Sequence, residues 1–174
     1  MAIFYIEFRK GWIYLEKKIF GSNGILGFDY GNQPYSSDLE KITLQNLLEQ
    51  TDGFDSKLPE KCSKEYYNKQ NEPYDMKTFI DCVLDDTIEN PIDTPGSKWQ
   101  ISSFGYVLLG RVIEKLSKMT YEKYVRKNVL EKCNSKNIHI GKNRFYRLDQ
   151  HVLIPFSAIA PGFESLNLGR NSWR

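Results

Sequence analysis

The sequence predicts a mainly α-helical fold with long connecting loops. Apolar residues recur at helical spacing in three segments, 43–53, 75–83 and 104–130. Between these segments the chain is rich in Gly, Asn, Ser, Pro and charged residues, a composition that is typical of loops. With 174 residues, of which 40% are hydrophobic and 26% charged, the chain is long and apolar enough to form one domain with a buried core.

The strongest helical pattern lies in residues 95–130 and predicts a helical hairpin. Ser102 or Ser103 offers a side-chain oxygen that caps the first helix, whose apolar stripe begins at Phe104. Thr120 caps the second helix in the same way. The buried face of the second helix is expected to comprise Tyr121, Tyr124, Val125 and Val129.

Two glycines, Gly105 and Gly110, interrupt the apolar stripe of the first helix. A glycine inside a helix destabilises it by about 1 kcal/mol relative to alanine. We therefore expect another stretch of backbone to pack close to the helix at these two positions.

The elements before the hairpin are shorter. Residues 21–38 are predicted to form an ordered loop, and Thr43 to cap a short helix that Gly53 ends. Residues 54–74 are polar and charged, so we interpret them as a surface excursion with little regular structure. Asp75 suits the N-terminal end of a further helix. The inward face of that helix is expected to comprise Met76, Phe79, Ile80 and Val83.

Charge and cysteine usage argue against several classes of function. The net charge of +2 gives no reason to expect a nucleic-acid or membrane partner. No run approaches about 18 apolar residues, and Glu7 interrupts an apolar N-terminus that has no basic residues ahead of it, so we expect neither a membrane span nor a signal peptide. Cys62, Cys82 and Cys133 share no metal-ligand spacing, and we interpret them as reduced, inert thiols. We expect no metal and no cofactor.

Several segments resemble one protein family. Residues 95–114, P-G-S-K-W-Q-I-S-S-F-G-Y-V-L-L-G-R-V-I-E, resemble the segment P-G-x-x-x-x-Y-S-N-x-G-Y-x-L-L-G-x-I-I-E of the serine β-lactamase-related family, which includes class C β-lactamases, D-alanyl-D-alanine carboxypeptidases and related esterases. Residues 42–53, I-T-L-Q-N-L-L-E-Q-T-D-G, are similar to its segment I-T-I-R-H-L-L-T-H-T-S-G. The resemblance covers residues 1–141 and implies the helical lobe of the family's α+β fold, without most of its antiparallel sheet. Residues 142–174 are left as an irregular C-terminal tail, and 138–140 as a short strand.

The resemblance also implies where catalytic groups belong. The family attacks a carbonyl with the Ser of an S-x-x-K motif, whose Lys helps to take up the proton. No serine in this chain has a lysine three positions later. The second motif, Y-x-N or S-x-N, falls at Ile101, Ser102 and Ser103; Ile101 has no titratable proton, and Ser103 lacks the amide. His139 begins an H-x-G triplet like the third motif, but it follows the hairpin directly, so we interpret it as structural. We therefore expect no catalytic residue and no activity.

Three functions remain open at this point. The first is hydrolase or peptidase chemistry, and the second is a non-catalytic binding or scaffolding protein that kept the fold. The third is a truncated gene model of an active enzyme, since the uncapped apolar residues 1–9 resemble the last turns of the family's nucleophile helix. A lobe without its sheet exposes apolar surface, so we expect a homo-oligomer or a protein partner. A small-molecule substrate is not expected for this chain alone, and the compartment stays open.

Overall fold

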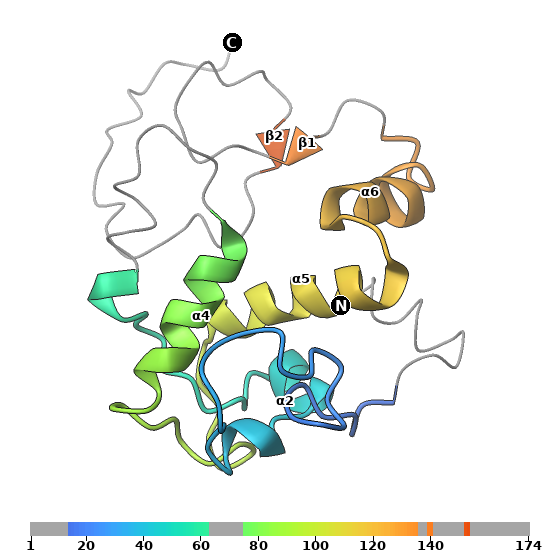
Figure 1. Ribbon diagram of the computed structural model, residues 1–174. Coiled ribbons are helices and arrows are strands. Elements are labelled where there is room, and N and C mark those ends of the chain that lie inside the picture. The colour runs from blue at the N-terminus through green and yellow to red at the C-terminus, as the bar shows by residue number, and fades with distance from the viewer. Residues whose placement is uncertain (1–13, 63–74, 136–138, 141–151, 154–174) are drawn as a thin grey trace. The chain divides into compact units, whose positions relative to one another are not determined.

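The computed structural model describes residues 14–62, 75–135, 139–140 and 152–153, and this part is mainly helical, as predicted. The chain divides into two compact units, Met1–Lys136 and Asn137–Arg174. In chain order, the elements are η1 Leu39–Lys41, α2 Leu44–Glu49, α4 Met76–Asp86, α5 Ser103–Ser117, α6 Tyr121–Val125, the π-helix η2 Arg126–Leu130, β1 His139–Ile140 and β2 Val152–Leu153 (Figure 1). None of the described helices is both long enough and apolar enough to cross a membrane.

The second unit contains the only named strands among the described residues. β1 runs parallel to β2, with His139 opposite Val152 and Ile140 opposite Leu153. The short strand expected at 138–140 is therefore present at its last two residues. The described part of the chain is a helical lobe without most of a sheet, which agrees with the predicted fold class.

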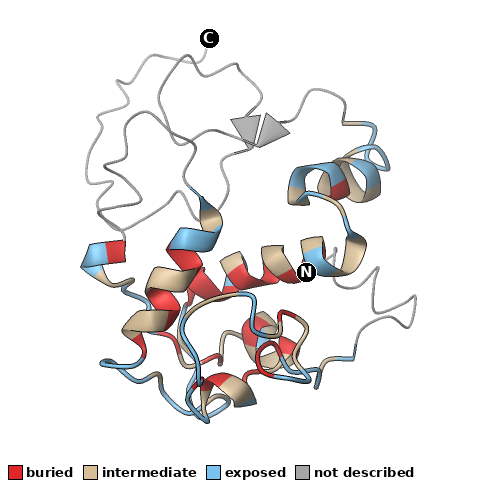
Figure 2. Cartoon of the chain, viewed as in Figure 1, coloured by how far each residue is buried: buried red, intermediate tan, exposed pale blue. Residues whose placement is uncertain are grey.

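Helix α5 begins where its sequence predicts. Ser102 is the N-cap, and its Oγ accepts a hydrogen bond from the Gly105 N–H at 3.0 Å. Lys118, with φ +56°, ends the helix in the left-handed conformation. Six residues of this helix are buried: Phe104, Gly105, Leu108, Leu109, Val112 and Ile113. Figure 2 shows that these positions form a stripe along α5, whereas α6 is mainly exposed or half-buried.

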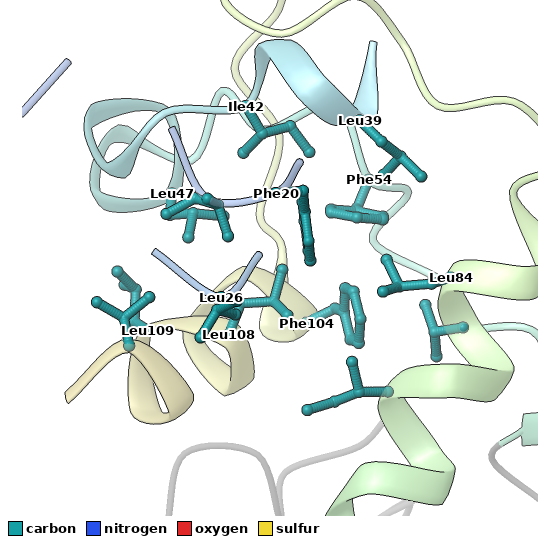
Figure 3. Close-up of a cluster of buried hydrophobic side chains, with 14 of the residues drawn as sticks. Phe20, Leu26, Leu39, Ile42, Leu47, Phe54, Leu84, Phe104, Leu108 and Leu109 are labelled. Carbon is teal, nitrogen blue, oxygen red and sulfur yellow. The ribbon is translucent and has the colours of Figure 1, made fainter. Parts of the chain in front are cut away.

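The core of the first unit forms where α5 meets the loop segments, α2 and α4 (Figure 3). The Phe104 ring packs edge-on against Phe54, with ring centroids 4.7 Å apart, and against Phe79 at 6.1 Å. Phe20 is 1% exposed and contacts Tyr35 in a similar edge-on geometry, with centroids 5.5 Å apart. These aromatic contacts join a loop to α5, α4 to α5, and two loop segments to each other, which helps a short set of helices to build a continuous core.

The caps of the other helices also follow the sequence. Thr43 and Asn46 form a reciprocal capping box at the start of α2. Asp75 caps α4 by accepting from the Lys77 N–H, and Thr120 caps α6 by accepting from the Lys123 N–H. The predicted end of α2 was wrong, because the helix stops at Glu49 and Gln50 already has φ +59°.

The predicted buried face of the second hairpin helix is only partly correct. Tyr124 is 2% exposed, but Tyr121, Val125 and Val129 are half-buried. The α-helix ends at Val125 and continues as a π-helix, so Val129 does not lie on the α-helical stripe that the spacing predicted.

The prediction that another backbone packs close to Gly105 and Gly110 was wrong, because side chains are the nearest neighbours at both positions. A Cβ atom on Gly105 would lie 2.4 Å from Oδ2 of the Asp52 side chain, and a Cβ on Gly110 would have the Tyr121 ring as its nearest neighbour, at 3.9 Å. The group that approaches Gly105 closely is therefore the buried Asp52 carboxylate. At Gly110 the distance to the Tyr121 ring is an ordinary van der Waals contact.

Two predictions about residues 54–74 were wrong within the described part, 54–62. Phe54 is 5% exposed and Cys62 is 0% exposed, so the segment is anchored in the core at both ends. Cys62 and Cys82 are also not reduced thiols; they form a disulfide, with Cα atoms 5.8 Å apart, that joins this segment to α4. Cys133 is free and exposed. The pairing could not be read from the sequence, because only the packing of the segment against α4 brings the two cysteines together.

Candidate functional site

The three second-motif positions lie at the entrance to α5 and have different environments. Ile101 is 54% exposed, Ser102 is 1% exposed and Ser103 is half-buried. The Ser102 Oγ accepts from the Gly105 N–H, so this hydroxyl is used for helix capping, as predicted. The only large side chain that this triplet presents to solvent is therefore an aliphatic one.

Backbone hydrogen bonds fix residues 93–100, which precede the triplet, against the segment 50–53. The Gln100 N–H donates to the Gln50 carbonyl at 2.9 Å, and the Gly96 N–H donates to the Thr51 carbonyl at 2.8 Å. The Asp93 N–H donates to the Gly53 carbonyl at 3.0 Å. The two segments that carry the family resemblance thus lie side by side. The hydrogen bond of Gln100, the residue immediately before Ile101, fixes where the triplet begins.

Asp52 is the residue that sequence reasoning missed. It is 1% exposed; its Oδ1 accepts from the Phe54 N–H at 3.0 Å, and its Oδ2 has no hydrogen-bond partner. Burial raises the pKa of the Asp52 carboxyl from 3.8 to about 6, and the Phe54 amide and the Ser102 hydroxyl offset part of this rise. The Ser102 hydroxyl is near the carboxylate, although no hydrogen bond of ordinary geometry joins it to Oδ2. The sequence did contain an indication that this position is unusual, since Asp52 stands where the family segment T-S-G has its serine.

A cleft of about 650 Å³ lies next to Asp52 and the start of α5, since Gly53 and Phe104 are among its lining residues. Its lining comes from residues within 53–61, from the C-terminal end of α4, from residues within 90–100, and from Phe104. Gln100, which precedes the triplet, lines the cleft, whereas Ile101 is not among the lining residues. The cleft therefore lies beside the second-motif position and is separate from the side chain that occupies it.

The cleft is lined by charges of both signs, and several of these are paired with one another. Lys61 Nζ lies 2.7 Å from Asp86 Oδ1. Asp55 Oδ1 accepts from the Lys57 N–H at 2.9 Å and from Gln100 Nε2 at 3.2 Å. The Lys57 N–H holds the pKa of the Asp55 carboxyl below its usual value. Such a surface suits polar or zwitterionic groups, and these residues do not combine a nucleophile with a neighbouring base.

The described residues offer no metal site. Within 14–62, 75–135, 139–140 and 152–153, no group of three or more His, Cys, Asp or Glu residues is arranged to hold an ion. His139 is placed in β1 by its backbone, and His151 lies outside the described residues.

The family model described as Beta-lactamase matches residues 28–148, more than half of the chain. The chain therefore belongs to the beta-lactamase family, as its sequence segments had suggested. It is 28% identical over 109 residues to Protein flp of Staphylococcus aureus strain MRSA252, a match that covers 63% of this chain and 20% of that protein. Protein flp of strain N315 is 30% identical over 97 residues, which cover 56% of this chain and 18% of that protein. The chain thus spans about a fifth of the length of these relatives.

Two solved structures share the fold. A D-stereospecific amidohydrolase from a Streptomyces species superposes with a TM-score of 0.60 and 24% identity, over 76% of this chain and 38% of that one. The octameric penicillin-binding protein homologue from Pyrococcus abyssi superposes with a TM-score of 0.54 and 22% identity, over 74% of this chain and 28% of that one. Both likenesses support the prediction of a helical lobe from a penicillin-binding-protein-like fold.

Proposed function

We propose that this chain is a helical lobe of the beta-lactamase family that does not itself carry out acyl-transfer chemistry. The observation that carries the proposal is the exposed Ile101 side chain, which stands where the family's second motif has a tyrosine or serine. An aliphatic side chain can neither accept nor donate a proton, so the proton transfer that activates a serine nucleophile has no partner here. The adjacent Ser102 hydroxyl is occupied in capping α5, and Ser103 lacks an amide.

A covalent probe tests this proposal directly. The purified chain is incubated with a labelled fluorophosphonate and, separately, with a labelled penicillin, and its intact mass is measured. We expect no adduct, while a class C β-lactamase treated in parallel is labelled stoichiometrically. The matched variant Ile101→Tyr/Ser103→Asn restores the family pattern of the second motif but still has no S-x-x-K serine, so it too is expected to remain unlabelled. A stoichiometric serine adduct on the unmodified chain would overturn the proposal.

A second candidate function is non-catalytic binding through apolar surface, with another copy of the chain as the partner. Trp99, Ile101 and Tyr106 are 65%, 54% and 45% exposed, and all three lie within residues 99–106 at the start of α5. Exposed apolar side chains gathered in this way are typical of interaction surfaces. The Pyrococcus abyssi homologue is octameric, which supports self-association as a property compatible with this fold.

Sedimentation equilibrium tests self-association. We expect the unmodified chain to be larger than a monomer and Trp99→Ser/Ile101→Ser to shift the mass toward the monomer value. Tyr14→Ser, which removes a side chain that is 69% exposed in a different segment, is the control and should leave the mass unchanged. A clean monomer of the unmodified chain at high concentration would rule this candidate out.

A further inference from the structure

Residues 55–61 form one wall of the cleft, and Leu58 is the member of this segment that packs against the hydrophobic core. We call these seven residues the cleft wall. All of them are exposed or half-buried, and the first fully buried residue that follows is Cys62, at 0% exposure. The near end of the wall is fixed differently, because Phe54 is in the core and Gly53 is paired with Asp93.

Polar contacts at the surface of the cleft also attach the wall. Gln100 Nε2 donates to Asp55 Oδ1 at 3.2 Å, and Lys61 pairs with Asp86 across 2.7 Å. The Lys61 side chain is 58% exposed, and ion pairs of this kind contribute little because water and salt screen them. The Cys62–Cys82 bond is covalent and joins the residue that follows the wall to the second turn of α4.

We propose that the Cys62–Cys82 disulfide is a redox-sensitive tether, which holds the cleft wall against α4 in oxidising conditions and releases it when the bond is reduced. Cys82 is half-buried as a residue while Cys62 is fully buried, so we expect an attacking thiolate to reach the Cys82 sulfur first. A dithiol reductant forms a mixed disulfide with Cys82 and expels the Cys62 thiolate. The second thiol of the reductant then closes on the first, leaving a cyclic disulfide and two reduced cysteines that have gained two electrons and two protons.

The reduced state favours release of the wall for a packing reason. Two thiol sulfurs that are no longer bonded repel each other at the bonded distance and must move apart, and Cys62 is completely enclosed. The wall can move because its own residues are exposed. Helix α5 has no bond to either cysteine, and its six buried residues keep their contacts with α2 and the loops. Reduction is therefore expected to open the cleft locally and to leave α5 folded. The cleft would be complete in an oxidising compartment and open in a reducing one.

Limited proteolysis with subtilisin, a protease that has no disulfide to lose, tests the tether. The full chain is digested with and without dithiothreitol, and the cut sites are mapped by mass spectrometry. We expect reduction to accelerate cleavage within 55–61 at least tenfold and to leave the rate of cleavage within 103–117 unchanged. The variant Cys62→Ala/Cys82→Ala should behave like the reduced chain with or without dithiothreitol. The control variant Cys133→Ala removes the exposed free thiol and should respond to the reductant as the unmodified chain does.

Three results would overturn the proposal. Equal cleavage of the wall before and after reduction would show that the disulfide does not hold it. Parallel acceleration within α5 would show that the bond supports the whole fold and has no local effect. Alkylation of three cysteines in the denatured but unreduced chain would show that the bond does not form. If the double alanine variant fails to fold, the reduced unmodified chain still decides between these results. None of the measurements depends on whether the chain hydrolyses anything.

Discussion

Two aspartates only three positions apart show how differently two neighbouring segments are built. Asp52 belongs to the segment 50–53, is 1% exposed and has a raised pKa. Asp55 belongs to the cleft wall, is exposed and has a lowered pKa. In the first segment, burial governs the electrostatics and backbone hydrogen bonds govern the position. In the cleft wall, local hydrogen bonds govern the electrostatics of Asp55, and the covalent Cys62–Cys82 link helps to govern the position of the segment. The rigid part of the candidate site is therefore the contact between 50–53 and 93–100, whereas the adjacent wall is an attached loop.

The largest expected effect comes from breaking the rigid segment at Gly53. Its φ is +88°, and a Cβ there would lie 2.1 Å from the Asp93 carbonyl oxygen, a backbone atom that cannot move aside easily. We expect Gly53→Ala to lower the free energy of unfolding by about 4 kcal/mol or to prevent folding. Gly27→Ala is the matched control, since φ is +61° there but no atom lies within 4 Å, and it should lose only about 1 kcal/mol. Urea denaturation followed by circular dichroism measures both, and equal effects would contradict the steric argument.

The next effect concerns the attachment of the wall. Cys62 and Cys82 are 20 positions apart, and closing a loop of that size stabilises a protein by about 3 kcal/mol, mainly by restricting the unfolded chain. We expect Cys62→Ala/Cys82→Ala to lose about this amount in urea denaturation, with Cys133→Ala unchanged. If the double variant is as stable as the unmodified chain, the disulfide is not a structural element.

The third prediction uses pH to separate the two aspartates. Because the Asp52 pKa is about 6 in the folded chain and 3.8 as its ordinary value, the folded state holds this proton more tightly than the unfolded state. The resulting stability is fully present below about pH 4 and is lost as the pH rises to about 6, a change of up to about 3 kcal/mol. Asp52→Asn should remove this loss and stabilise the chain at pH 7.5. Asp55→Asn is the control with the opposite sign, since a lowered pKa contributes stability that is present at neutral pH and lost on acidification. Thermal melts from pH 2 to 8 measure both, because the Asp55 contribution is lost only below its ordinary pKa of 3.8. Identical pH profiles for Asp52→Asn and the unmodified chain would refute the burial argument.

The smallest effect concerns the cap of α5. Ser102→Ala leaves the Gly105 N–H without its acceptor, and we expect a loss of about 1 kcal/mol in urea denaturation. Ser103→Ala, at the first residue of the helix, should change stability by less than about 0.5 kcal/mol. Equal losses from the two variants would mean that Ser102 is not the cap that positions this triplet.

Local elements of the fold were predictable because their causes are local. Ser102, Thr120, Thr43 and Asp75 cap the helices they were expected to cap, since a capping side chain bonds to N–H groups two or three positions away. The apolar stripe of α5 was also predictable, because helical periodicity alone decides which residues share a face. The segments that carry the family resemblance are local in the same sense, and the family match confirms them.

Features that depend on distant contacts were not predictable. The buried carboxylate of Asp52 beside Gly105, and the pairing of Cys62 with Cys82, join positions 53 and 20 residues apart. The end of α2 at Glu49 was missed because the following residues are drawn into hydrogen bonds with 93–100. In each case the sequence contains the residues but not the distances between them.

The sequence by itself therefore predicts where the main helices begin, their N-cap residues, the family and the lack of a titratable group at Ile101. Each of these follows from residue type and short-range spacing. The tertiary structure alone decided which aspartate is buried, which cysteines are bonded and where the cleft lies. Those properties arise from the packing of α4, α5 and the loops, which brings together residues that are far apart along the chain.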